Sequence, residues 1–479
     1  MNHILQNRFS SLTGILVGLL LAALTCGPAG AKEFTPFFGV GVETHTNINR
    51  GNNEPRTGNK PPPGEKSDTV FRPYAGFNFS EKVDKVSSEI QFRVERQLYS
   101  KGSFDDQNFF AVDGFVDYEV VPGRFIWATE DSANTRRIII QDPDTPDNLQ
   151  TFNVFTTGPD LYFNRGANDI VVKGRLGDVH YSDQLADNTR FIGSVALKRE
   201  VSEVSKVGLN VSGSLVRFQQ EFQVDYDLAA VVAGYDRETP WGSLGVQGGY
   251  NFIDFENGVS ENEPVIQGAL VVGGKEEGAN ALTFSASQKF SDPALDVFDP
   301  IYTRLFQVQG VGTVDTNERA GTGASRTRRG ELSFERRGDR YGLKLFGYYQ
   351  NLDRPVDIQE SQKEKGGGLN LNYVLRERLN VWVSYFRFES DFVNRRTGDE
   401  DAAKGDAAKD DAAKGDADTG EPINVNGETV AVGLTWQVRD RISLSAGAKW
   451  ETNDSNSVER RFEDNTVFVS LQYQGETPK

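Results

Sequence analysis

The sequence predicts an all-β protein: a single large antiparallel transmembrane β-barrel of the bacterial outer membrane, with about twenty strands and eighteen as the alternative count. Three observations lead to this fold class. Apolar and polar residues alternate through almost the whole chain, tight turns alternate with long connections, and the first residues have the pattern of an export signal. Helical periodicity is almost absent.

The alternation is clearest in residues 88–99, SEIQFRVERQLY, where Ile90, Phe92 and Val94 share one parity and charged or amide residues occupy the other. Successive side chains of a strand point to opposite faces, so we expect one side to face lipid and the other a wet interior. Comparable patterns predict strands at 35–47, 69–79, 87–99, 108–120, 124–130, 154–164, 169–181, 189–199, 205–217, 225–237, 243–255, 264–275, 280–291, 329–338, 340–352, 363–375, 379–391, 424–438, 441–451 and 460–473.

Connections of two very different lengths alternate along the chain. Pro122-Gly123 and Arg439-Asp440 are tight turns, and the long links are residues 48–68, 131–153, 292–328 and 392–423. Outer-membrane barrels have short periplasmic turns and longer extracellular loops. We therefore expect the long links to be extracellular, both chain ends to be periplasmic, and residues 32–479 to form one barrel.

The first 31 residues are predicted to be a secretory signal peptide. Arg8 precedes the apolar run 12–24, and Ala29-Gly30-Ala31 forms a small-x-small cleavage site. A lipoprotein with its lipid on Cys26 is the alternative, which Thr25 disfavours. We expect Sec-type export, removal of the signal and insertion into the outer membrane.

Removal of the signal would remove Cys26, the only cysteine, which excludes disulfides and thiolate chemistry from the mature chain. The formal net charge is −17; residues 1–31 contain one Arg and no acid, so the rest of the chain carries −18. Such a charge repels nucleic acid, and none is expected as a partner.

Candidate catalytic or metal-binding residues are few. After residue 31 the histidines are His45 and His180, and neither lies in a nucleophile signature. We expect no enzymatic activity, no cofactor and no metal site. A barrel hydrolase with partners distant in sequence is an unfavoured alternative.

The polar parities of the predicted strands supply the pore-lining candidates, which are Glu89, Gln91, Arg93, Glu95, Asp113, Asp117, Gln247, Asn251, Asn370, Asn372, Ser443, Ser445 and Lys449. A barrel of this size is too wide for its side chains to fill, so these groups could surround a wet lumen. Equally, they could pair across the wall and only stabilise the barrel.

The link 292–328 combines the apolar stretch 301–308 with several arginines. One hypothesis is that it folds into the lumen and narrows it, with Arg304, Arg319, Arg326, Arg328 and Arg329 as constriction candidates. The alternative is that it packs on the rim or extends the strands. The repeat 401–418, DAAKGDAAKDDAAKGDAD, lacks the ligand spacing of a calcium loop and is interpreted as a mobile extracellular loop.

One stretch resembles a known family. Trp127, Asp131 and residues 145–161, TPDNLQTFNVFTTGPDL, are similar to the outer-membrane barrel family that accompanies PEP-CTERM/exosortase exopolysaccharide gene clusters. The resemblance implies association with polymer secretion across the outer membrane, and it carries no catalytic residues over to this chain.

Three functions follow as hypotheses. The first is a porin-like or export-associated barrel, linked by the resemblance to exopolysaccharide secretion. The second is a non-conducting structural or surface-display barrel, and the third is the barrel hydrolase. The expected partners are outer-membrane lipid and lipopolysaccharide, the barrel-assembly machinery and, for the first hypothesis, polysaccharide and periplasmic export components.

Overall fold

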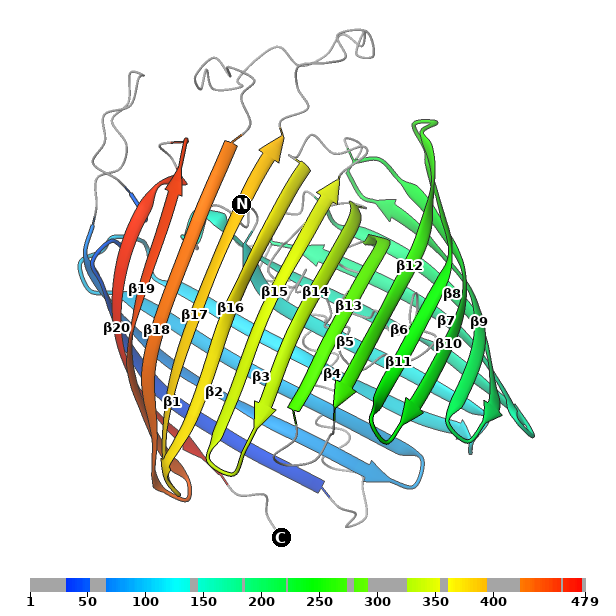
Figure 1. The fold of residues 1–479 in the computed structure, drawn as a ribbon, viewed down its shortest axis with the longest axis horizontal. Coiled ribbons are helices and arrows are strands. Elements are labelled where there is room, and N and C mark those ends of the chain that lie inside the picture. The colour runs from blue at the N-terminus through cyan, green and yellow to red at the C-terminus, as the bar shows by residue number, and fades with distance from the viewer. Residues whose placement is uncertain are drawn as a thin grey trace, which may run out of the picture.

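A computed structural model describes residues 32–51, 66–137, 145–182, 186–220, 223–273, 280–291, 325–353, 361–393, 423–457 and 460–475. Within these ranges the chain forms twenty strands and one short 3-10 helix, η1 (Pro146–Asn148) (Figure 1). The strands are β1 (Lys32–His45), β2 (Asp68–Val83), β3 (Val86–Tyr99), β4 (Gln107–Val121), β5 (Phe125–Arg137), β6 (Leu149–Arg165), β7 (Asn168–Tyr181), β8 (Asn188–Ser202), β9 (Ser205–Phe218), β10 (Tyr226–Thr239), β11 (Gly242–Phe255), β12 (Ser260–Gly273), β13 (Asn280–Ser291), β14 (Ser325–Arg337), β15 (Tyr341–Asp353), β16 (Ser361–Arg376), β17 (Leu379–Val393), β18 (Ile423–Arg439), β19 (Ile442–Ser455) and β20 (Phe462–Gln474).

All twenty strands belong to one closed antiparallel sheet. Each strand pairs with its sequence neighbours, and β1 pairs with β20 to close the barrel, with Phe38 opposite Tyr473 and Val42 opposite Val469. A closed sheet leaves no unpaired edge and satisfies the backbone polar groups internally, as a membrane-spanning sheet must. The predicted fold class and the count of twenty strands are confirmed.

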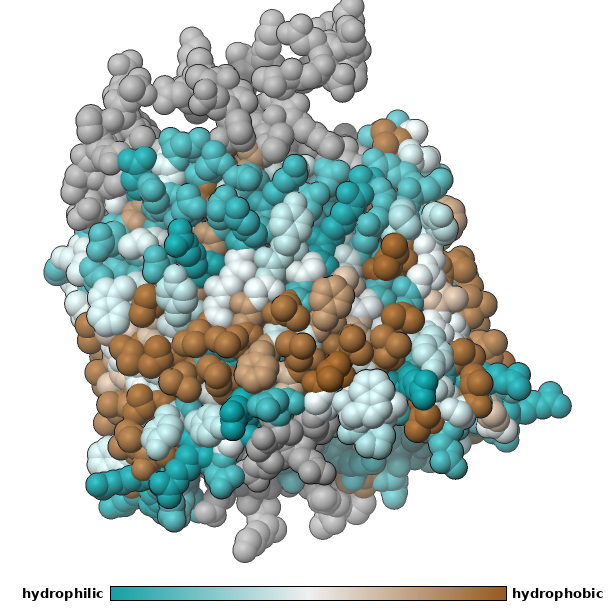
Figure 2. All heavy atoms as spheres, in the orientation of Figure 1, coloured by the Kyte–Doolittle hydropathy of each residue, from teal (hydrophilic) through white to brown (hydrophobic). Residues whose placement is uncertain are grey.

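The outer surface carries an apolar belt. Figure 2 shows a brown band in the half of the barrel nearer the short turns and a hydrophilic surface nearer the long connections. We call these two ends the short-turn end and the loop end. Exposed belt residues include Val195, Val211, Val231, Val246, Ile266, Leu282, Leu332, Leu345, Val432, Leu434, Val467, Val469 and Leu471. Apolar side chains around a closed barrel are the surface that lipid requires, and this is the architecture of an outer-membrane barrel.

Strands continue past the belt at the loop end, and this explains two predicted loop bounds that were wrong. The link expected at 131–153 is shorter, because β5 extends to Arg137 and β6 begins at Leu149. Outside the belt an outward side chain need not be apolar, so the alternation of apolar and polar residues disappears from the sequence although the strands remain paired through their backbones. Asn153 Nδ2 donates to Asp131 Oδ1 at 2.8 Å between outward positions of these strands.

The link expected at 292–328 also ends early, because β14 begins at Ser325 and pairs with β13 and β15. The links 48–68 and 392–423 agree with the strand ends within three residues. The signal segment 1–31, the apolar stretch 301–308 and the repeat 401–418 lie outside the described residues. Within the described ranges, no helix is long and apolar enough to cross a membrane.

Candidate functional site: the lumen wall

The polar parity of β3 and β4 faces the lumen, as the sequence predicts. In the β3–β4 register Gln91 lies opposite Asp113, whereas the exposed belt residue Val94 lies on the other parity. Glu89, Gln91, Arg93 and Asp113 are all exposed although they point inward. Inward side chains can be accessible only if the lumen beside them is open to water, so this part of the barrel holds a wet cavity.

An ion-pair network joins β1, β2 and β3 on the same inner wall. Arg72 Nη1 lies 2.7 Å from Glu43 Oε1 and its Nη2 lies 2.6 Å from Glu95 Oε1. Arg93 Nη2 lies 2.7 Å from Glu95 Oε2, and the Arg93 guanidinium lies 4.2 Å from the centre of the Tyr74 ring. Glu95 is therefore a paired, buried residue of the wall rather than a free pore-lining carboxylate.

A second charged group lies further round the wall. Arg175 on β7 pairs with Asp160 on β6, and both side chains are almost inaccessible, with exposed fractions of 1% and 6%. Lys173 Nζ lies 3.5 Å from the same carboxylate. Asp117 on β4 is inward and half-buried.

The remaining pore-lining candidates also point inward, but they differ in their access to water. Gln247 is buried and donates to Gln267 at 2.6 Å, and Asn251 is buried further along β11 toward the loop end, so neither lines an open channel. The candidates on β16 and β19 are half-buried or exposed: Asn370 accepts a hydrogen bond from Ser384 at 2.8 Å, Ser445 lies 3.2 Å from Thr435, and Lys449 lies 3.0 Å from Glu451. Asn372 and Ser443 occupy the same inner parity.

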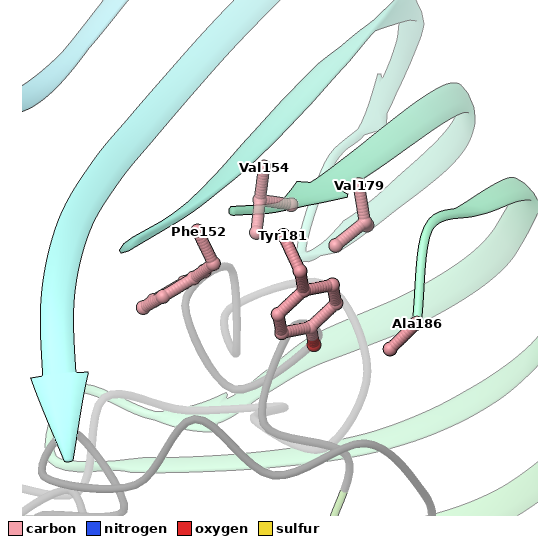
Figure 3. Packing of buried hydrophobic residues seen from close by; sticks show 5 residues of the cluster. All are labelled: Phe152, Val154, Val179, Tyr181 and Ala186. Carbon is pink, nitrogen blue, oxygen red and sulfur yellow. The ribbon is translucent and has the colours of Figure 1, made fainter. Parts of the chain in front are cut away.

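The inner wall of β6–β11 is closed to water at its loop end and carries two apolar clusters among buried polar residues such as Asn188 and Arg190. Figure 3 shows one cluster there, formed by Phe152, Val154, Val179, Tyr181 and Ala186, with exposed fractions between 0% and 3%. A second cluster consists of Val216, Tyr226, Ile253, Phe255 and Phe290. Inward side chains on this side are thus packed against protein, unlike those of β3 and β4.

Phe290 shows how this packing arises. Phe290 is an even-numbered residue of β13, like Leu282 and Phe284, whose side chains are exposed on the outer surface. Its own side chain is nevertheless buried against inward residues of β9–β11. Pairing of β12 with β13 stops at Ile266 and Gln288, although β12 continues toward the loop end (Figure 1). The loop ends of β13 and β14 therefore leave the wall and bend into the lumen.

Arg326 fixes this bend. Its Nη2 lies 2.6 Å from Glu263 Oε1 and 2.9 Å from Glu261 Oε2, both on inward positions of β12, and its Nη1 lies 3.3 Å from Asp353 Oδ2. Its guanidinium also approaches the Phe290 ring, 5.8 Å from the centroid. The arginine is shared among three carboxylates and holds a strand end inside the barrel.

The predicted constriction residues thus have mixed placements. Arg326, Arg328 and Arg329 are strand residues of β14, not loop residues. Arg328 approaches Glu263 at 4.0 Å, and Arg329 pairs with Glu331 at 2.7 Å and lies over the Tyr348 ring at 4.6 Å. Arg304 and Arg319 lie outside the described residues.

Both histidines after residue 31 are bound by carboxylates near the loop end. His45 Nδ1 lies 2.8 Å from Asp464 Oδ2 across the β1–β20 seam, and Asn47 N donates to the other oxygen of Asp464 at 2.9 Å. His180 Nε2 lies 2.7 Å from Asp178 Oδ2. Among the described residues, no group of three or more His, Cys, Asp or Glu side chains is arranged to hold a metal ion.

Aromatic residues on the inner face of β15–β20 were not expected from the sequence. We call them the aromatic wall; they are Phe346, Tyr348, Trp382, Phe386, Phe388 and Phe468. Parity could have found them, because Trp382, Phe386 and Phe388 alternate with Val381, Val383 and Tyr385. Their inward direction follows from the pairing of Ser384 with Asn370 on the inner face.

Comparisons with known proteins add the following. No family model matches this chain and no curated protein matches it. Among solved structures it is similar to the siderophore receptor PirA of Pseudomonas aeruginosa, with a TM-score of 0.45 and 11% identity over 93% of this chain and 81% of that one.

Two further similar structures are OccK2 (OpdF) of Pseudomonas aeruginosa, with a TM-score of 0.42 and 11% identity over 93% of this chain and 98% of that one, and OccAB3 of Acinetobacter baumannii, with a TM-score of 0.39 and 8% identity over 93% and 99%. Likeness at this level carries no functional argument. The resemblance to the exosortase-associated family stays a prediction.

Proposed function

We propose that this barrel is a porin-like channel that lets hydrophilic solutes cross the outer membrane through its lumen, without catalysing a reaction. The observation that carries the proposal is the exposure of Glu89, Gln91, Arg93 and Asp113 on the inner face. Charged side chains on the inner face of a barrel that crosses lipid stay hydrated only if water fills the space beside them, so these residues favour a water-filled path along β3 and β4.

The experiment is planar-bilayer recording of the refolded protein. The proposal predicts discrete conductance steps in potassium chloride, and replacement of Asp113 by Lys should shift the reversal potential toward anion selectivity, because a fixed charge of opposite sign then faces the path. A folded, heat-modifiable protein that gives no conductance steps would contradict the proposal.

The second candidate is a non-conducting barrel, and a specific observation favours it. The bent ends of β13 and β14 and the apolar clusters of β6–β11 occupy part of the lumen at the loop end. The same recordings separate the two candidates, since a plugged barrel would conduct only after Arg326 is replaced.

A link to exopolysaccharide secretion is a finer form of the first proposal. It rests on the resemblance at Trp127, Asp131 and residues 145–161, most of which lie in β5 and β6. Genes for exosortase and polysaccharide synthesis next to this one would support an export role, with polysaccharide and periplasmic export components as partners. Neighbours of unrelated function would leave a general porin.

A further inference from the structure

The rings of the aromatic wall lie nearly parallel to one another. Phe386 is 6.1 Å from Phe346 with an interplanar angle of 19°, and 6.3 Å from Tyr348 with an angle of 7°. Phe388 lies 5.8 Å from Phe386, and Trp382 lies 6.2 Å from Phe468 at 16°. Near-parallel rings that reach across the intervening strands from β15, β17 and β20 form a flat apolar surface rather than an interdigitated core.

Glycines on the adjacent strands explain why the rings lie flat. Trp382 is opposite Gly433, Phe388 is opposite Gly427 and Phe468 is opposite Gly447. A Cβ at Gly433 would lie 2.6 Å from Cζ2 of Trp382, a Cβ at Gly447 would lie 2.5 Å from Cζ of Phe468, and one at Gly427 would overlap the Phe388 ring. Each ring therefore covers a glycine with one face.

The faces of Trp382, Phe388 and Phe468 that do not cover a glycine are directed to the lumen, whereas the Arg329 guanidinium lies over the Tyr348 ring at 4.6 Å. All six side chains are only partly buried, as expected for rings that are covered on one side. Hydrogen-bonding groups are interleaved with them: Ser384 lies between Trp382 and Phe386 on β17, and Tyr348 Oη donates to Glu364 at 2.6 Å. From Trp382 to Phe388 the surface follows β17 for about 20 Å.

Flat aromatic faces with polar groups at their edges match the chemistry of a sugar ring. A pyranose presents an apolar C–H face and a rim of hydroxyl groups, so it can stack on a ring and hydrogen-bond beside it. The net charge of −17 disfavours nucleotides and other stacking anions at long range, although Arg329 and Lys344 lie over the rings of Tyr348 and Phe346.

We propose that the aromatic wall binds neutral linear oligosaccharides inside the lumen. The proposal rests on the proposed function in one respect, namely that a solute can enter the lumen. Stacking along β17 gives a chain-like ligand several successive contacts, so affinity rises with the number of sugar units.

The test is isothermal titration calorimetry of the refolded protein with maltohexaose and cellohexaose. The wild type should bind at least one of them, and Trp382→Leu and Phe386→Leu should each weaken binding at least about tenfold. Trp450→Leu is the matched control, because Trp450 is an exposed belt residue on the outer face of β19, and it should leave the affinity unchanged.

Trp382→Phe separates loss of stacking from loss of folding. It keeps an aromatic ring over Gly433, so binding should stay within about threefold of the wild type, and heat-modifiable migration reports whether each variant folds. The inference is overturned if neither hexasaccharide binds the wild type, or if both leucine variants fold and bind as the wild type does. Sugar binding without conductance would contradict the proposed channel but not the sugar site. Conductance without sugar binding would contradict the sugar site but not the channel.

Discussion

Arg326 on β14 is bonded to Glu263 on β12, with an Nη2–Oε1 distance of 2.6 Å, although β13 lies between these strands in the sheet. The contact exists because the loop ends of β13 and β14 bend into the lumen. Side chains that point outward elsewhere on these two strands therefore pack there against the inner face of β12. A local departure from the barrel wall thus brings a cation to two inward carboxylates.

We expect Arg326→Ala to release this bend. The change removes the cation that Glu261 and Glu263 share and leaves Arg328, 4.0 Å from Glu263, so the free energy of unfolding should fall by about 1–3 kcal/mol, less than for a fully buried pair because both sides are partly exposed. Single-channel conductance should rise. Urea titration in lipid vesicles and bilayer recording measure the two effects.

Arg337→Ala is the control for this variant, because Arg337 lies on the same strand with a side chain that is 79% exposed. It should change the unfolding free energy by less than about 0.5 kcal/mol. Equal conductance in the wild type and in Arg326→Ala would show that the bend does not restrict the path.

The pair of Arg175 and Asp160 should be a stronger stability determinant. Both side chains are almost fully buried, and Arg175→Ala leaves the Asp160 carboxylate with Lys173, whose Nζ is 3.5 Å away, in place of the direct guanidinium contact, so it should cost about 3 kcal/mol of unfolding free energy, the lower end for breaking a buried pair. The double variant Arg175→Met, Asp160→Leu removes both charges and should recover most of the loss. A double variant as unstable as the single one would argue against this electrostatic explanation.

The glycines beneath the aromatic wall should tolerate no side chain. Gly427→Ala places a Cβ within the Phe388 ring, so the ring or the strand must move, and we expect a loss of about 1–3 kcal/mol in unfolding free energy. Gly330→Ala is the matched control, since no atom lies within 4 Å of a Cβ there. Equal unfolding midpoints for the two variants in urea would contradict the close packing of ring and glycine.

The two faces of β20 should respond differently to charge. Val469 faces the belt with an exposed fraction of 46%, and Ser470 is its inward neighbour. Val469→Arg places a charge on the lipid face and should lower the unfolding free energy in lipid by about 2–4 kcal/mol, and Ser470→Arg by much less. Urea unfolding in lipid vesicles measures both changes in free energy. A larger loss for Ser470→Arg than for Val469→Arg would show that the inner and outer faces of β20 are assigned the wrong way round.

Sequence predicted the architecture well because alternation and backbone pairing have the same period of two. The strand count, the closure and the inward direction of Gln91, Asn370 and Ser445 all follow from that period. The bounds of β5, β6 and β14 were missed because their loop ends leave the belt, where outward positions are polar and alternation is lost.

The candidate site was only partly predictable. Selecting the polar parity of each strand correctly predicted the hydrated inward residues of β3 and β4. The same rule missed Trp382, Phe386 and Phe388, because these inward residues are aromatic. The contact of Arg326 with Glu263 joins residues far apart in sequence and depends on a bend of two strand ends. No local pattern encodes such a bend, so only the structure shows it.

The central claim, a wet and conducting lumen, is tested most directly by cysteine modification during bilayer recording. A chain that begins at residue 32 contains no cysteine, so Gln91→Cys and Val94→Cys each introduce a single thiol, on the inner and outer face of β3 respectively. A negatively charged, membrane-impermeant thiol reagent should react at position 91 and lower the conductance in steps, and it should have no effect at position 94. Conductance that is unchanged at position 91 and reduced at position 94 would contradict the account.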